Sequence, residues 1–323
     1  MKAAVLGENG VEIRDVPKPA LKAGEVLIRV RATSLNRADL KVASGHQHGK
    51  VGGVGSRIGL ECAGEVEAVG EGVTRFKPGD RVMAASPGGY AEYIAAAEPR
   101  TSRIPGNNTT YEQAACLPVA LQTLHNAIVT AGRFKAGETL LIVGASSGVG
   151  LMGLQIGKVM GASKVMGTST NAERRTRLAE FGCDLAVDTN DPAWPQQVKD
   201  ATGGKGVDLI VDMVSGPTVN QSLEAAALLG RIVNVGRLGG TTGAFNFDLH
   251  AMKRIDYIGV TNRTRTQAEL NDVTERMRED LWPAVETGTL SLPIERSFPL
   301  DKVTDALAMM NANRHFGKIV LTM

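Results

Sequence analysis

The sequence is poor in cysteine and in aromatic residues, and it has no strong excess of charge of either sign. Its three cysteines, Cys62, Cys116 and Cys183, lie far apart and form no C-x-x-C pair. That spacing excludes a disulfide scaffold and a zinc ribbon, and it fits a reducing compartment. Aromatic residues make up only 4% of the chain, too few for a platform that stacks single-stranded nucleic acid. With 36 basic and 34 acidic residues, the chain also lacks the large excess of one charge that gives nucleic-acid and membrane-surface binders an electrostatic potential of one sign.

Long hydrophobic runs are missing as well. The longest, such as 140–143 and 224–229, fall far short of the roughly 18 residues of a membrane-spanning helix. The N-terminal segment 1–15 contains acidic residues and no apolar stretch of the kind that secretion signals need. These absences predict a cytoplasmic globular protein with no membrane or nucleic-acid partner. At roughly 150 residues per domain, the length predicts about two domains.

Glycine is the residue in excess, at 38 of 323 positions, which indicates many tight turns and close backbone approaches. In the first 110 residues, glycine-rich turns separate short segments in which apolar and polar residues alternate, such as 26–31 and 65–69. Alternation with period two over short segments predicts antiparallel strands in a small barrel or sandwich. The N-terminal part is therefore expected to be a β domain.

From about residue 110 the pattern changes to alternating strands and helices. Apolar segments separated by helix-length stretches occur at 138–143, 163–168, 184–188, 207–213, 231–235 and 256–260. Strands that are apolar throughout must be covered on both faces, as in a parallel sheet between helix layers. Helices are also expected near 149–160, 172–181, 266–286 and 297–312. The final apolar segment 317–323 is expected to return to the N-terminal β domain.

The strongest chemical signal is the glycine-rich turn VGASSGVG at 143–150, between a predicted strand and a predicted helix. Gly148 and Gly150 permit a tight turn, and the helix N-terminus that follows offers N–H groups to a pyrophosphate. Ala145 and Ser147 stand where G-x-G-x-x-G has its first two glycines. A turn that carries glycine for steric reasons alone is the alternative, but the strand before it and the helix after it favour a dinucleotide site.

The end of the second strand indicates which dinucleotide binds. Residues 167–171, GTSTN, contain no acid to hold a ribose 2′-hydroxyl, and Arg174 and Arg175 follow one helical turn later. Hydroxyl and guanidinium groups suit a 2′-phosphate, so NADPH is the predicted cofactor. A solvated helix face is the alternative for the two arginines.

The chain resembles the zinc-free, zeta-crystallin-like quinone oxidoreductases of the medium-chain dehydrogenase/reductase superfamily. The resemblance covers almost the whole chain, and it rests on motifs that occur here at 34–40, 58–73, 76–82, 88–93, 114–128, 145–150 and 315–321. It implies an α/β protein with a GroES-like β-barrel catalytic domain formed by 1–120 and 263–323, and a Rossmann domain of parallel sheet at 121–262.

The same resemblance implies that no metal is bound. The related alcohol dehydrogenases hold catalytic zinc with a cysteine and a histidine, where this chain has Asn36 and Leu60. The four-cysteine lobe is also absent, since only 88–89 separates the flanking strands, and zinc needs three or four ligands. His46 and His48 form an H-x-H pair, for which a solvated glycine-rich loop is the preferred interpretation.

Without a metal to polarise a carbonyl, the acceptor must already be electrophilic, either a quinone or an alkene conjugated to a carbonyl. The predicted function is NADPH-dependent hydride transfer to such acceptors. An enoyl-thioester or enone reductase and a cofactor-binding protein with little catalysis remain as alternatives. His125 lies on a predicted helix, where a structural role is favoured over a catalytic one.

The resemblance also implies the site residues. Asn36 is the catalytic candidate and lines the nicotinamide pocket, with a turn asparagine as its alternative interpretation. The predicted cofactor-binding residues are Asn36, Thr123, Ala145, Gly148, Val149, Ser169, Arg174, Gly236, Leu238 and Lys318. Lys41 stands where the family often has a tyrosine near its quinone. A homodimer is expected, paired through an edge strand at 254–260.

Overall fold

The computed structural model describes residues 1–47, 49, 52–106 and 108–323, and they form two compact units. The first unit contains Met1–Ala120, Asn262–Asp280 and Ser291–Met323, and the second contains Leu121–Thr261 and Leu281–Leu290. The sequence predicted 1–120 with 263–323 and 121–262. Segment 281–290, which the sequence assigned to the catalytic domain, lies in the second unit.

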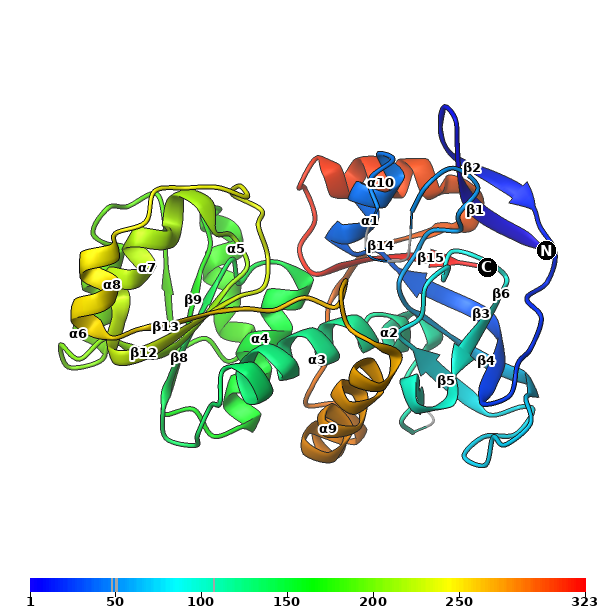
Figure 1. The fold of residues 1–323 in the computed structure, drawn as a ribbon, viewed down its shortest axis with the longest axis horizontal. Coiled ribbons are helices and arrows are strands. Elements are labelled where there is room, and N and C mark those ends of the chain that lie inside the picture. The colour runs from blue at the N-terminus through cyan, green and yellow to red at the C-terminus, as the bar shows by residue number, and fades with distance from the viewer. Residues whose placement is uncertain (48, 50–51, 107) are drawn as a thin grey trace. The chain divides into compact units, whose positions relative to one another are not determined.

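The first unit is built on a mixed sheet of seven strands (Figure 1). In spatial order they are β14 (Ile294–Pro299), β15 (Lys318–Thr322), β3 (Glu25–Ser34), β4 (Cys62–Val69), β5 (Arg81–Ala84) and β7 (Thr101–Arg103), and β6 (Tyr93–Ala97) also pairs with β3. A separate hairpin pairs β1 (Lys2–Gly7) with β2 (Gly10–Asp15). The alternation in β3 buries Val26, Ile28 and Val30 in one cluster, because successive side chains of a strand point to opposite faces.

The C-terminal strand β15 lies inside this sheet, as the sequence predicted. It runs antiparallel to β3, with Val320 opposite Ser34, and parallel to β14. Helices α1 (Arg37–Ala43) and α10 (Val303–Asn311) cover this part of the sheet. They share one core cluster with β15, in which Val42, Leu307 and Ile319 are buried. Both ends of the chain therefore contribute to one core.

The second unit is a six-stranded parallel sheet with helices around it (Figure 1). The strand order is β10 (Leu185–Val187), β9 (Lys164–Thr168), β8 (Thr139–Val143), β11 (Val207–Asp212), β12 (Ala226–Asn234) and β13 (Asp256–Gly259). The order reverses between β8 and β11, which makes a switch point at the carboxyl ends of the strands, where such sheets bind ligands. All six predicted strands are present, and β13 is the edge strand that the sequence predicted.

Helices connect the strands of the second unit. They are α4 (Gly148–Val159), α5 (Ala172–Thr176), α6 (Trp194–Ala201), α7 (Val219–Ala225) and α8 (Phe247–Lys253). The indole of Trp194, fully buried, lies in a core cluster with Leu141 and Ile210. The helix expected at 172–181 is instead a short α5 followed by the 3-10 segment η3 (Arg177–Phe181).

One helical run, Tyr111–Ala131, is long and apolar enough to cross a membrane by length and composition, although the sequence predicted no such segment. It comprises α2 (Tyr111–Ala115), α3 (Pro118–His125) and the π-helical η2 (Asn126–Ala131). Of its apolar window, 72% is buried inside the protein. This burial is typical of a core helix. Helix α9 (Gln267–Glu286), with Pro283 inside it, is the longest helix.

Candidate active site

The glycine-rich turn after β8 has the geometry of an anion cradle. Ser147 is the N-cap of α4, and its Oγ accepts a hydrogen bond from Gly150 N at 3.0 Å. A Cβ on Gly150 would lie 2.6 Å from the carbonyl oxygen of Gly144, so a side chain is excluded there. The first N–H groups of an α-helix have no partner within the helix and attract anions. Gly148 and Val149 lie in this first turn of α4.

The end of β9 lies beside this turn. The backbone N–H of Ala145 donates to Thr168 O at 2.9 Å, and the hydroxyl of Ser169 donates to Ser146 Oγ at 3.0 Å. Ser169 is 5% exposed. These contacts hold two hydroxyl groups together where the adenosine ribose lies in a Rossmann-type site.

The two arginines that follow β9 have different surroundings. Arg175 donates to Ser169 O at 2.8 Å and to Asp188 Oδ2 at 3.0 Å, so its guanidinium holds the strand end in place. The backbone N–H of Arg174 is capped by the side chain of Asn171. Asp188, which follows β10, is thereby paired, and residues 167–171 contain no carboxylate.

The loops after β11 and β12 approach each other closely. A Cβ on Gly236 would lie 2.2 Å from Met213 O, so only glycine fits there. Asp212 is fully buried, and its Oδ1 accepts from Val214 N and Ser215 N, each at 2.9 Å. Burial raises the pKa of Asp212 above its ordinary range, against the effect of these hydrogen bonds. Leu238, also on the β12 loop, is half exposed.

Ser215 has a backbone conformation that few side chains adopt. Its φ is 59° and its ψ is −158°, a region occupied almost only by glycine. Its hydroxyl donates to Gly236 O at 2.8 Å and accepts from the side-chain amide of Asn234. Hydrogen bonds to the end of β12 and to the loop after it thus hold a strained residue at the carboxyl edge of the sheet.

Asn36 lies in the first unit, at the N-cap of α1, and is 6% exposed. Its Nδ2 donates to Glu61 Oε1 at 2.8 Å, and its Oδ1 accepts from Lys318 Nζ at 3.0 Å. The second Nδ2 contact, to Ser34 O, is long at 3.5 Å. The side-chain amide is therefore held at both ends and keeps one weakly satisfied N–H.

Glu61 and Lys318 form a buried ion pair of 2.9 Å, with side chains 0% and 3% exposed. Lys318 Nζ also donates to Leu35 O at 3.1 Å, so its three N–H groups each have an acceptor within the first unit. Glu61 Oε1 also accepts from Ser34 Oγ at 2.5 Å, and Oε2 accepts from Val119 N at 2.8 Å, at the start of α3. A charged pair this far from water is tolerated only with such complete hydrogen bonding.

A second buried carboxyl, that of Asp39, accepts a hydrogen bond from the backbone of Asn36. Asp39 Oδ2 accepts from Asn36 N and from the hydroxyl of Tyr90, each at 2.7 Å. Burial raises the pKa of Asp39 to about 7, although both hydrogen bonds act to lower it. Among the described residues, Asp39 Oδ1 has no hydrogen-bond partner, which agrees with a carboxyl that holds its proton up to neutral pH.

The residues at the expected zinc positions have other roles. Leu60 packs against the core cluster of the first unit, and Asn36 is bound as described above. In the part of the chain that the structure describes, no group of three or more His, Cys, Asp or Glu residues could hold a metal. Of the H-x-H pair that the sequence contains, His48 lies outside the described residues. Cys62 and Cys116 are free and buried, and burial raises the pKa of each thiol to about 12.

The structure brings the predicted residues together within each unit. In the second unit, Ala145, Gly148, Val149, Ser169 and Arg174 surround the ends of β8 and β9, and Gly236 and Leu238 follow β12. In the first unit, Asn36 and Lys318 are in contact. Thr123 is half buried on α3.

Sequence reasoning missed Ser34, Glu61 and Ser146. Ser146 stands in the glycine-rich turn that was already singled out. Glu61 directly follows Leu60, the residue used to exclude zinc.

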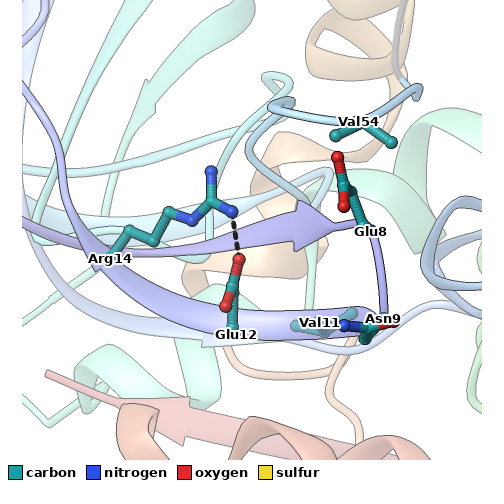
Figure 2. A pocket seen from close by; sticks show the side chains of 7 residues that line it. Glu8, Asn9, Val11, Glu12, Arg14 and Val54 are labelled. Carbon is teal, nitrogen blue, oxygen red and sulfur yellow. Dashed lines mark ion pairs between the residues drawn. The ribbon is translucent and has the colours of Figure 1, made fainter.

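A depression of about 360 Å³ lies elsewhere, at the β1–β2 hairpin (Figure 2). It is lined by Glu8, Asn9, Gly10, Val11, Glu12, Arg14 and Val54. An ion pair joins Arg14 to Glu12 across it. It contains none of the predicted site residues, and its lining is that of a polar surface turn.

Two family models match successive stretches of the chain. Residues 22–123 match the alcohol dehydrogenase GroES-like domain, and residues 148–279 match the family described as zinc-binding dehydrogenase. These matches confirm the expected fold class, a GroES-like domain with a Rossmann-type parallel sheet.

Individual relatives cover nearly the whole chain. Human quinone oxidoreductase is 30% identical over 310 residues, which are 95% of this chain and 92% of the relative. A mycobacterial protein solved in complex with NADPH is 27% identical, with a TM-score of 0.88 and full coverage of both chains. A mycocerosic acid synthase-like polyketide synthase of Mycobacterium tuberculosis is 30% identical over 299 residues, but this chain spans only 14% of it. The chain is thus an oxidoreductase of the medium-chain dehydrogenase/reductase superfamily, and it belongs there to the quinone oxidoreductase family.

Proposed function

We propose that the protein is a metal-independent reductase that transfers hydride from NADPH to quinones or to other conjugated carbonyl acceptors. The observation that carries this proposal is the hydrogen-bonded group of Asn36, Glu61 and Lys318, in which Asn36 stands at one of the positions where related dehydrogenases hold zinc. Such a group supplies fixed dipoles and a hydrogen-bond donor, but it offers no set of metal ligands. The name of the human relative, a quinone oxidoreductase, supports the same acceptor class.

NADPH is the proposed cofactor because the residues at the end of β9 fit its 2′-phosphate. Ser146 and Ser169 present adjacent hydroxyl groups, and Arg174 adds a cation without a carboxylate in segment 167–171. Gly148 and Val149 offer backbone N–H groups to the pyrophosphate, and Gly236 and Leu238, on the loop after β12, are the proposed contacts on the nicotinamide side. When bound, NADPH supplies a hydride at C4 of its nicotinamide.

Asn36 is the proposed catalytic residue. Hydride addition to a quinone or an enone leaves negative charge on the carbonyl oxygen, and a fixed amide N–H stabilises such charge. The weakly satisfied Nδ2–H of Asn36 is suited to this task. The proton that completes the quinol or the ketone comes from water in this scheme, since none of the three N–H groups of Lys318 is free.

The proposal is tested by steady-state assays of NADPH oxidation with 1,2-naphthoquinone, a short enone and an enoyl-thioester. Turnover with the quinone or the enone is the expected result. Turnover with the thioester alone would favour the enoyl reductase alternative, for which the similarity to a polyketide synthase is the supporting observation. Quenching of NADPH fluorescence without any turnover would identify a cofactor-binding protein instead.

We further propose a homodimer in the cytoplasm. Strand β13 is an open edge of the parallel sheet, and an unpaired edge favours pairing with a two-fold mate. The three free and buried thiols suit a reducing compartment.

A further inference from the structure

The side-chain amide of Asn36 is fixed by two opposite charges, one at each end. The ammonium of Lys318 donates to Oδ1 at 3.0 Å, and the carboxylate of Glu61 accepts from Nδ2 at 2.8 Å. The two ends of an asparagine amide have nearly the same shape, so their hydrogen bonds decide which end carries the oxygen and which the nitrogen. Here the reversed orientation would set Nδ2 against an ammonium and Oδ1 against a carboxylate. The ion pair therefore permits one orientation only.

The pair also holds the backbone around this amide. Lys318 donates to Leu35 O, and Glu61 accepts from Ser34 Oγ. Glu61 and Lys318 are 257 positions apart. They meet because β15, which begins at Lys318, and β4, which Glu61 directly precedes, both pair with β3. Residues from three separate parts of the chain thus converge on one side chain.

Stability alone does not account for such a pair. Two charges removed from water lose hydration energy, and apolar residues of similar volume often serve the fold as well or better. An ion pair does have a property that apolar residues lack, since it selects the direction of a neighbouring dipole. A direction that is set before the reaction avoids the cost of turning the donor during it.

We propose that Glu61 and Lys318 are positioning residues that lock the Asn36 amide in the orientation needed for hydride transfer. The catalytic part of this inference rests on the proposed function, in which Nδ2–H stabilises negative charge on the acceptor. The lock itself is a property of the folded chain and can be measured without turnover.

The first test separates a positioning role from a structural one. Glu61→Gln alone leaves a buried ammonium unpaired and lowers the melting temperature. The double variant Glu61→Gln/Lys318→Met removes both charges, keeps the shapes and restores most of the melting temperature. Its kcat stays at least about tenfold below wild type, because a misplaced donor is costly. Recovery of both melting temperature and kcat would overturn the proposal.

Two controls define the effect. In an Asn36→Ala background the double substitution should cause no further loss of kcat, since the residue that it positions is gone; a further loss of tenfold would overturn the proposal. The exposed pair Asp272–Arg276 on α9, neutralised as Asp272→Asn/Arg276→Met, should leave melting temperature and kcat unchanged. A tenfold loss of kcat in this control would attribute the effect to charge removal in general and would also overturn the proposal.

The second test measures the lock directly. The side-chain amide protons of Asn36, identified by their absence in Asn36→Ala, should exchange slowly with solvent in ¹⁵N-labelled wild type and fast in the double variant. Fast exchange in wild type would overturn the lock whatever the activity. Slow exchange in a wild type that reduces no acceptor would support the lock and refute the proposed function.

Discussion

The hydroxyl of Ser169 donates a hydrogen bond to Ser146 Oγ at 3.0 Å, and this contact joins the end of β9 to the glycine-rich turn that follows β8. Both residues come from the second unit, at the carboxyl ends of β8 and β9. The proposed preference for a 2′-phosphate at this pair can be tested by substituting one neighbouring residue, Arg174.

Arg174→Ala should weaken NADPH and leave NADH nearly unchanged, because only NADPH carries the 2′-phosphate. A hydrogen bond to a charged group contributes about 1.5–3 kcal/mol, which corresponds to roughly tenfold to hundredfold in affinity. The measurement is a pair of cofactor titrations at one fixed quinone concentration. Arg177→Ala, which removes an exposed ion pair with Glu180, is the matched control and should change neither cofactor.

Equal losses for both cofactors in Arg174→Ala would assign that side chain to the fold. Arg175→Ala is expected to weaken the binding of both cofactors equally, because Arg175 donates hydrogen bonds to Ser169 O and Asp188. A wild type that prefers NADH would contradict the interpretation of the whole strand end.

The purified protein should contain no stoichiometric zinc and should keep its activity in a chelator. Leu60 stands in the core where a histidine ligand would be needed, and a zinc site needs three or four ligands. Elemental analysis together with an assay before and after dialysis against chelator provides the measurement. A zinc-dependent alcohol dehydrogenase treated in parallel is the control, and one tightly held zinc per chain, lost together with activity, would refute the prediction.

The protein should form a dimer in solution through β13. Light scattering should give a species of twice the 34.1 kDa chain at working concentrations. Ile258→Lys places a charge on the edge strand, a substitution that opposes pairing of edges, and should shift the equilibrium toward monomer. A wild type that scatters as a single chain over the whole concentration series would exclude the dimer.

Ser215→Gly should be more stable than Ser215→Ala. Both variants lose the hydroxyl bonds to Gly236 and Asn234, so these losses cancel in the comparison. Only glycine relieves the strain of the backbone, which costs on the order of 1–3 kcal/mol. Glycine is also more flexible in the unfolded chain, and this lowers the stability of the glycine variant by up to about 1 kcal/mol. Urea unfolding should therefore place the glycine variant about 1–2 kcal/mol above the alanine variant, and equal stabilities would show that the conformation carries no strain.

The sequence predicted the parallel sheet well because its strands are apolar throughout and are separated by helix-length segments. It also predicted the return of β15, from the resemblance and from an apolar segment with no place in the βαβ series. Helix 172–181 was predicted as one element, but the chain tightens into η3 at Arg177 and ends at Gly182, whose φ of 85° stops the helix. Local propensity does not reveal such a change of helix type.

The Glu61–Lys318 pair was beyond prediction from the sequence for a different reason. Its partners are brought together by strand pairing between distant segments, and the sequence around Glu61 does not indicate that a lysine will pair with this carboxylate. The strain at Ser215 was also hidden, because a serine beside Gly216 is an ordinary turn sequence. Motifs thus located the glycine-rich turn, whereas the hydrogen bonds around Asn36 depend on the tertiary fold.

The stability of the protein should fall as the pH rises toward neutrality, through Asp39. Burial raises the pKa of Asp39 to about 7 in the folded chain, whereas the unfolded value is about 3.9. Between these values the folded state keeps a proton that the unfolded state releases, so unfolding becomes easier with rising pH, up to a plateau above the folded pKa.

Asp39→Asn mimics the protonated carboxyl and should remove this dependence. Relative to wild type, the variant should gain up to about 1.4 kcal/mol for each pH unit between roughly pH 4 and 7. Urea unfolding of both proteins over this range gives the difference directly. Tyr90→Phe removes a hydrogen bond that lowers the pKa of Asp39, so it should extend the sloping range of its own stability curve to higher pH. Parallel curves for wild type and Asp39→Asn would mean that Asp39 has the same pKa in the folded and unfolded chain, and that the proton is not held by the buried site.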